Sequence, residues 1–291
     1  MRVTETRMLD MAAASVADAR DRAAQAQNVL SSGNRVTVPS DDPAAWAQGE
    51  RAAVRKSMSS DRGQAIGLAI DGLQSTDGTL ATVTTALSQL GALATQGANG
   101  TLDATGRKAI ADQVRALRAT ALSAMNQKGP DGSFLLSGSN GTSAPFTPAG
   151  AYVGDGTART IQSAEGQTAP GTVTGKDLTS ANGGVDVLSV FDQLATALDA
   201  NDVAGVQAAM PGVQSAVSQV TQTRSLIGER LSALQSADDA RQSFEQSMTE
   251  RHASAVEADP IAAASDLART SIVLESAQAA AQHVIAMLQQ R

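Results

Sequence analysis

Side chains that could carry acid–base or metal chemistry are few in this 291-residue sequence. The two histidines, His252 and His283, lie far apart and match no metal-ligand spacing such as HExxH. Asp41 and Asp42 form a carboxylate pair that could act as general acid and base. They also stand directly before Pro43, where a carboxylate accepts hydrogen bonds from the first amides of a helix. We therefore predict exposed helix positions for the histidines and helix capping for the two aspartates.

Three short glycine-containing sequences resemble ligand or modification sites. Gly154-Asp155-Gly156 lacks the GK[ST] sequence of a phosphate loop and predicts a β-turn. Asn99-Gly100-Thr101 and Asn140-Gly141-Thr142 match the glycosylation sequon, but Asn-Gly is first a turn signal. The absence of cysteine excludes disulfides, thiolate nucleophiles and cysteine-based metal sites. We therefore predict no catalytic residue, no cofactor-binding residue, no metal site and no enzymatic activity.

The composition favours helices and argues against several partners. Hydrophobic residues make up 42% of the chain but aromatic residues only 2%, which favours closely packed helices over a core of large rings. The net charge of −7 comes without a basic run interleaved with aromatics, so neither nucleic acid nor an anionic membrane surface is an expected partner. The N-terminal segment carries charges throughout, so we expect no cleaved signal peptide.

Apolar residues recur every seven positions in both terminal segments, a spacing typical of coiled coils. In the N-terminal segment the row is Leu9, Val16, Ala23 and Leu30. In the C-terminal segment the row is Leu267, Leu274, Ala281 and Leu288, and Val284 belongs to the companion row. Both seams are rich in small residues, so such helices are marginal alone. We therefore predict that these residues form an assembly interface, with the two seams as partners for each other and for further copies of the chain.

The C-terminal seam has an unusually wide apolar face. Val273, Ala280, Ile285 and Met287 extend it beyond the width that one partner helix covers. Two interpretations remain open: burial within the core of one subunit, or burial among several subunits. The low charge of the last stretch favours the second, and an uncovered surface of this kind predicts a chaperone before assembly.

The interior of the chain has its own heptad seam, made of Ile66, Leu73, Leu80 and Leu87. These bulky residues predict the core of a folded subunit. Helices are expected over 44–96 and 102–127, and a short helix near 203–210 precedes a long one that Pro211 opens and that ends near His252. Asp259 is expected to cap the last helix.

From Gly129 to Val185 helical periodicity disappears and glycine and proline become frequent. Short β-prone pieces at 133–136, 151–153, 159–162 and 172–174 predict a small all-β insertion. The predicted fold is mainly α with this insertion: an elongated antiparallel helical bundle or coiled-coil rod, with the termini together and the β domain at the far end. The predicted boundaries are 1–42 (N-terminal assembly segment), 43–128 (outgoing helices), 129–185 (β insertion), 186–252 (returning helices) and 253–291 (C-terminal assembly segment).

One pair of motifs resembles a known family. The residues concerned are Ser32, Gly33 and Arg35, followed by Pro39, Ser40, Asp41, Asp42 and Pro43. They resemble the N-terminal signature of the flagellin superfamily, in the form seen in its hook-associated members. The segment 132–155 resembles the entry to the β domain of those members, and 224–231 and 257–288 resemble their returning and C-terminal helices.

The resemblance implies a structural component of the bacterial flagellum: a junction subunit that links the hook, via the first hook-associated protein, to the flagellin filament. It implies a ring homo-oligomer, an inner coiled-coil layer made by the termini, and torque transmission through helix packing. It also implies an extracellular protein exported through the flagellar type III apparatus, with an export chaperone on its C-terminal region. Two alternatives stay open: a flagellin filament subunit, or a carbohydrate-binding, adhesion or enzymatic module on a helical stalk.

Overall fold

The computed structural model describes residues 2–289, and the side chains of residues 6–181 and 183–287. Its elements are, in chain order, α1 (Arg2–Ser32), α2 (Pro43–Gly97), α3 (Ala104–Met125), β1 (Thr160–Ala164), β2 (Gln167–Pro170), the 3-10 turns η1 (Gly175–Leu178) and η2 (Ser180–Asn182), α4 (Val187–Asp199), α5 (Val203–Val256) and α6 (Pro260–Gln289). The prediction of a mainly helical fold with a small β element is confirmed over this range.

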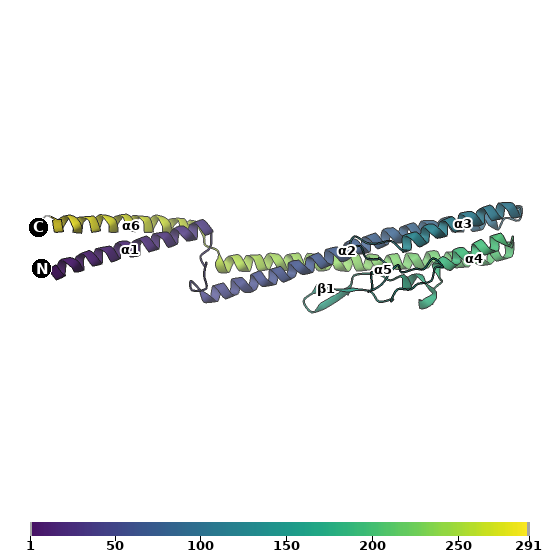
Figure 1. The fold of residues 1–291 in the computed structure, drawn as a ribbon, viewed down its shortest axis with the longest axis horizontal. Coiled ribbons are helices and arrows are strands. Elements are labelled where there is room, and N and C mark those ends of the chain that lie inside the picture. Colours follow the sequence, from purple (N-terminus) through teal and green to yellow (C-terminus); the bar gives the residue numbers. More distant parts are fainter. Residues whose placement is uncertain (1, 290–291) are drawn as a thin grey trace. The chain divides into compact units, whose positions relative to one another are not determined.

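The chain divides into two compact units. The terminal unit contains the residues up to Met58 and from Phe244 onward, and the central unit is Ser59–Ser243. In the terminal unit α1 and α6 run side by side, purple and yellow in Figure 1, with the two chain ends at the same end of the pair. The predicted pairing of the termini is therefore confirmed.

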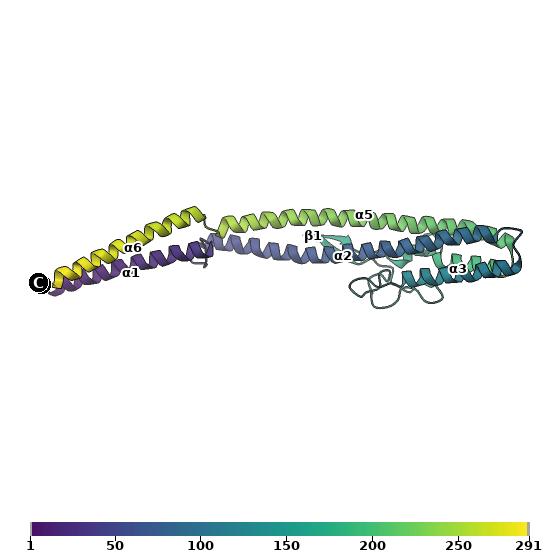
Figure 2. The ribbon, with the colours of Figure 1, turned by 90° about the horizontal axis from the view of Figure 1, so that it is seen from above.

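The central unit is built on the predicted interior seam. Ile66, Leu73, Leu80 and Leu87 are all fully buried. α2 and α5 run antiparallel in this unit (Figures 1 and 2). Asp77 of α2 pairs with Arg224 of α5. Gly97, which comes later in α2, lies against Val206, which comes earlier in α5. Burying a large apolar side chain stabilises by about 1.5 to 3 kcal/mol, so this seam is a main source of the unit's stability.

A close helix contact explains one of the glycines in α2. A Cβ atom added at Gly63 would lie 2.7 Å from Cζ of Arg241 on α5. The glycine leaves room for the guanidinium to cross the helix at this point, and a larger residue would require the arginine side chain to shift. This packing offsets part of the low helix propensity of glycine.

The helices α3 and α4 pack against each other and close the same core. Asp103 and Asp186 cap them, each accepting hydrogen bonds from amides of the first turn. At the turns that join α2 to α3 and α4 to α5, the buried Arg107 donates to the carbonyl oxygens of Gly97 (3.0 Å) and Asn99 (2.8 Å) and to the side-chain oxygen of Asn201. One side chain therefore ties the two turns together.

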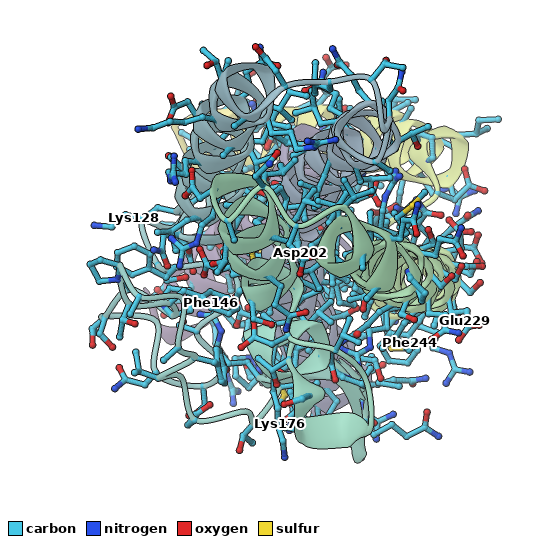
Figure 3. All side chains as sticks on the ribbon, turned by 90° about the vertical axis from the view of Figure 1, so that its right-hand side faces the viewer. Lys128, Phe146, Lys176, Asp202, Glu229 and Phe244 are labelled. Carbon is cyan, nitrogen blue, oxygen red and sulfur yellow. The ribbon has the colours of Figure 1, made fainter. Side chains whose placement is uncertain are left out.

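Between α3 and α4 the insertion lies against the helices of the central unit. Amide side chains of the helical framework hold it: Asn126 pairs with both the N–H and the C=O of Phe146 at 2.9 Å, and Gln219 accepts from Val185 N and donates to Asp177 O, each at 2.9 Å. Phe146 is buried, whereas the exposed Lys128 and Lys176 reach outward (Figure 3). In this unit the insertion lies alongside the helices, and the α2–α3 and α4–α5 turns lie beyond it. The predicted placement of the β domain at the far end is therefore wrong.

Only part of the predicted β structure forms regular strands. The piece at 159–162 is confirmed, since β1 pairs antiparallel with β2. The pieces around Phe134 and Tyr152 make only isolated bridges, to Lys128 and to Phe146, and 172–174 forms no strand. In the insertion, side chains form hydrogen bonds with backbone N–H and C=O groups that would pair with a neighbouring strand in a larger sheet.

The prediction that Pro211 separates two helices is wrong. α5 runs continuously from Val203 to Val256 with Pro211 inside it. An internal proline costs about 3 kcal/mol. The buried Val206, Ala209 and Val213 flank it on one packed face, and their burial offsets this cost.

Candidate assembly interface

The side chains that could carry acid–base or metal chemistry do not lie together in one site. His283 is exposed, as predicted, whereas His252 is only partly exposed. Among the described residues, no group of three or more His, Cys, Asp or Glu side chains is placed to hold a metal ion. Within residues 2–289, no helix combines the length and the apolar character needed to cross a membrane. The predicted residues that do lie near one another are those of the family motif and of the terminal seams, which all belong to the terminal unit.

The family motif forms the linker between α1 and α2. Ser32 is the last residue of α1, and Gly33 follows it with φ of +72°, a left-handed conformation that favours glycine at a helix C-terminus. Pro39 and Ser40 lie in a turn closed by the Asp41 N–H, which donates to Val38 O at 3.0 Å. The motif therefore encodes a helix stop, a turn and a helix start.

The two aspartates of the motif act as caps. Oδ2 of Asp41 accepts from the N–H groups of Thr37 (2.9 Å) and Val38 (3.1 Å), and these bonds lower the pKa of Asp41. Oδ1 of Asp42 accepts from Ala45 N at 3.0 Å. That bond, followed by the hydrogen bond and charge of Arg35, lowers the pKa of Asp42. Pro43 is the first residue of α2, so the predicted helix capping is confirmed for Asp42. Asp41 instead accepts from linker amides that precede it.

The linker also binds the junction between α5 and α6. Asn34 and Glu257 form an antiparallel bridge, and Arg35 N donates to Val256 O at 2.7 Å. The Arg35 guanidinium donates to Ala255 O at 3.0 Å and lies 3.4 Å from Asp42. These contacts make the two linkers one joint of the terminal unit, which the sequence periodicity did not predict.

A small apolar cluster lies under this joint. It consists of the buried Val36, Ala255 and Val256, with Ala45 and Trp46 packed against it. Beyond the joint, Asp259 caps α6 by accepting from Ile261 N at 2.8 Å, as predicted. The joint therefore has both a polar and an apolar component.

The predicted seam residues of α1 and α6 face each other only in part. Val16 and Ala23 are partly buried in α1, and Ala19 and Ala26 of the companion row are buried. In α6 the partly buried seam residues are Leu267, Leu274, Ala281 and Val284. Leu9 and Leu30 remain 41% and 39% exposed, and the side chain of Leu288 lies outside the described residues. The pair thus packs through small residues and leaves two of its leucines exposed.

Exposed apolar side chains are concentrated in the terminal unit. Among the large hydrophobic side chains found exposed in the described part of the chain, all but Leu68 and Val153 belong to this unit. The three on the wide face of α6 are Val273 (46%), Ile285 (45%) and Met287 (52%), as the sequence predicts, and Ile272 is 66% exposed. A concentration of exposed apolar side chains makes this unit the candidate interaction surface.

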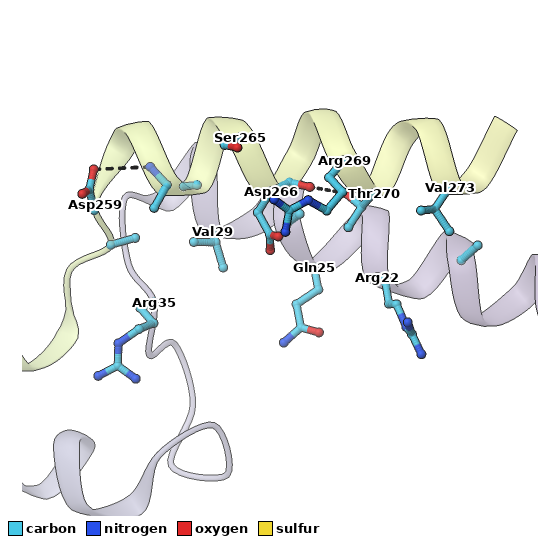
Figure 4. A pocket seen from close by; sticks show the side chains of 15 residues that line it. Arg22, Gln25, Val29, Arg35, Asp259, Ser265, Asp266, Arg269, Thr270 and Val273 are labelled. Atoms are coloured by element: carbon cyan, nitrogen blue, oxygen red, sulfur yellow. Dashed lines mark hydrogen bonds between the residues drawn. The ribbon is translucent and has the colours of Figure 1, made fainter. Parts of the chain in front are cut away.

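A groove runs between α1 and α6 near the joint (Figure 4). Its volume is about 950 Å³. Alanine and valine side chains lie along it together with three arginines, Arg22, Arg35 and Arg269, and two aspartates, Asp259 and Asp266. The groove therefore offers apolar surface with charges of both signs, which suits a partner helix of mixed charge.

The comparisons with known proteins agree with this geometry. Residues 5–141 match the family model of the bacterial flagellin N-terminal helical region. A solved structure of a putative flagellar hook-associated protein from Vibrio parahaemolyticus is 24% identical, with a TM-score of 0.68 over 75% of this chain and 100% of that one. Comparison with curated protein sequences gives no match.

Two further solved structures have the same fold. FlgL from Xanthomonas campestris is 19% identical, with a TM-score of 0.60 over 70% of this chain and 99% of that one. The flagellar hook-associated protein-3 from Legionella pneumophila is 15% identical, with a TM-score of 0.59 over 69% and 96%. The chain is therefore similar to the flagellin N-terminal helical region over residues 5–141 and shares its fold with solved flagellar hook-associated proteins.

Proposed function

We propose that this protein is a structural subunit of the bacterial flagellum that joins the hook to the filament. It binds the first hook-associated protein on one side, flagellin on the other and further copies of itself in a ring. Its role is mechanical and non-enzymatic: packed helices transmit torque from the hook to the filament. The match of residues 5–141 to the flagellin N-terminal region and the fold of the hook-associated proteins support this proposal.

The observation that carries the proposal is the uncovered apolar surface of the terminal unit. Ile272 and Met11 are 66% and 62% exposed on α6 and α1. Each such side chain gains about 1.5 to 3 kcal/mol on full burial. Neighbouring subunits that cover these side chains therefore stabilise the assembly, and the charges in the α1–α6 groove set the register of the incoming helix.

The same surface has consequences before assembly. The protein leaves the cell through the flagellar type III export apparatus and functions outside it, at the hook–filament junction. Until then, an export chaperone covers the apolar face of α6, because uncovered apolar patches of this kind aggregate. The terminal segments, 1–42 and 253–291, serve as the assembly region.

An exposed residue tests the proposal without disturbing the fold of the subunit. Ile272 on α6 is 66% exposed, so Ile272→Asp is expected to leave the isolated subunit folded. A buried carboxylate in the assembly would cost several kcal/mol, so the variant should fail to enter the hook tip and should abolish filament growth and motility. Electron microscopy of hook tips and a swimming assay in cells lacking the native protein measure these effects.

Leu68→Asp is the matched control. Leu68 is 61% exposed on α2 in the central unit, so the substitution adds the same charge to a helix at similar exposure. This variant should assemble and support filaments. Normal junctions with Ile272→Asp, or equal loss with both variants, would contradict the proposal. Polymerisation of the purified protein alone into long filaments would favour a filament subunit instead.

A further inference from the structure

Two identical tripeptides occupy different surroundings in the central unit. Asn99-Gly100-Thr101 and Asn140-Gly141-Thr142 have the same sequence. Both asparagines are exposed, and each side-chain oxygen accepts hydrogen bonds from the threonine two residues on. Because the local sequence is the same, any difference in their chemistry comes from the fold.

An Asn-Gly pair can react without an enzyme. The amide nitrogen of the glycine attacks Cγ of the asparagine, and an N–Cγ bond forms as the Cγ–Nδ2 bond breaks and ammonia leaves. Water then opens the resulting succinimide ring to give aspartate or isoaspartate. Glycine favours the reaction because it has no Cβ beside the attacking nitrogen and its backbone rotates freely.

The surroundings of Gly100 leave it free to move. No heavy atom outside its own neighbours lies within 4 Å of a Cβ added there. Gly100 is the second residue of a turn in which Leu102 N donates to Asn99 O at 3.2 Å. Asn99 O also accepts from the Arg107 guanidinium at 2.8 Å, but the attacking nitrogen itself lies in an exposed turn where no packed atom crowds the glycine.

The surroundings of Gly141 are restrictive. A Cβ added there would lie 2.5 Å from Cβ of Ser133, and the Gly141 carbonyl accepts from Phe134 N at 2.9 Å. On the other side of Asn140, the backbone N–H of Ser139 donates to Asp155 at 3.0 Å. Ring closure requires rotation about the Cα–C bond of Asn140, because the peptide bond itself stays planar, and this rotation breaks these contacts.

We propose that Asn99-Gly100 is a site of spontaneous deamidation in the folded protein, and that the fold protects Asn140-Gly141 from the same reaction. The modification adds a negative charge at the turn between α2 and α3. In the isoaspartate form the main chain also gains a methylene group. The oxygen of residue 99 that accepts from the Arg107 guanidinium at 2.8 Å then belongs to a free carboxylate and no longer to the main chain. The contact that joins the two turns is therefore altered as the protein ages.

Peptide mapping by mass spectrometry tests the proposal on the full-length protein. After incubation at mildly alkaline pH and 37 °C, a gain of one mass unit at each asparagine gives the two rates. The rate at Asn99 should exceed that at Asn140 by about tenfold or more, a ratio that corresponds to about 1.4 kcal/mol. In guanidinium chloride the two rates should become similar, because the restraints at Gly141 are lost.

Gly100→Ala is the control variant. The position has open space and no positive φ, so the fold should be retained, which circular dichroism checks. The added methyl group should slow the reaction at Asn99 several-fold and leave Asn140 unchanged. Equal native rates, a faster reaction at Asn140, no reaction in the native protein, or a difference that persists in denaturant would each overturn the proposal.

Discussion

Carboxylate and amide side chains act in this protein chiefly as partners for backbone groups. Asp41 and Asp42 cap the linker and α2, and Asp155 does the same in the insertion, where it accepts from Ser139 N and Thr157 N, each at 3.0 Å. The hydrogen bonds of Ser139, followed by that of Thr157, lower the pKa of Asp155 to about 2. The residues that look most like acid–base groups in the sequence are thus structural.

The depressed pKa of Asp155 predicts acid sensitivity of the insertion. Since the folded pKa lies below the unfolded value of about 3.9, the stabilising contribution is complete above that value and is lost as the pH falls towards about 2. Asp155→Asn should be less stable than the native protein at pH 7 and should show a weaker loss of stability in this pH window. Urea unfolding followed by circular dichroism at several pH values measures both effects.

Glu165→Gln is a suitable control for the acid experiment, because Glu165 is exposed in the hairpin turn of the same insertion. Its unfolding midpoints should follow those of the native protein at every pH. A pH profile of Asp155→Asn that coincides with the native profile would contradict the assignment of the acid-sensitive interaction to Asp155.

A second prediction at the residue scale concerns Gly175. A Cβ atom added there would lie 2.7 Å from the Tyr152 ring and 2.8 Å from the Phe146 ring, which stack at a centroid distance of 5.3 Å. Gly175→Ala should therefore destabilise the central unit by about 1 to 3 kcal/mol through overpacking. Gly78→Ala, in the interior of α2 with nothing within 4 Å, should instead stabilise by about 0.5 to 1 kcal/mol. Thermal or urea unfolding of both variants checks the opposite signs.

At the scale of the elements, periodicity and capping signals predicted most of the helices. The seam of Ile66, Leu73, Leu80 and Leu87 was predictable because large residues occupy four successive positions seven residues apart, and all four are fully buried. The boundary at Pro43 was predictable because capping is local in sequence. The sequence rule that proline ends a helix failed at Pro211. Buried residues before and after the proline pack against the core and keep α5 continuous.

The parts that could not be predicted depend on contacts distant in sequence. The Arg35 guanidinium reaches Ala255 O across 220 positions, and no periodic pattern encodes that bond. In the insertion, Asn126 and Gln219 supply bonds that strands would otherwise make, so β-prone composition overpredicted strands. The exposure of Leu9 and Leu30 likewise depends on how α6 lies against α1.

The two seams should differ in their contribution to the stability of the isolated subunit. Leu80 is fully buried, so Leu80→Ala should cost about 2 to 5 kcal/mol in the free energy of unfolding. Leu274 is only partly buried, so Leu274→Ala should cost less. Urea unfolding of the two variants tests this order, and a larger loss for Leu274→Ala would show that the terminal seam already belongs to the stable core of the subunit.

At the scale of the whole molecule, the two units differ in how completely they bury their apolar residues. The central unit buries large side chains of α2, α3, α4 and α5 in one continuous cluster. The terminal unit packs through small residues and leaves Met8, Met11, Ile272 and Ile285 exposed. This difference is the expected one for a subunit whose centre folds alone and whose ends are completed by neighbouring subunits.

Hydrogen–deuterium exchange, measured on the purified subunit and on subunits assembled at the hook tip, tests this division most directly. In the free subunit, amides of α1 and α6 should exchange much faster than those of α2 between Ile66 and Leu87, and they should become protected on assembly. The amides of α2 should be equally protected in both states. Strong protection of α1 and α6 in the free subunit, or exchange there that assembly leaves unchanged, would contradict it.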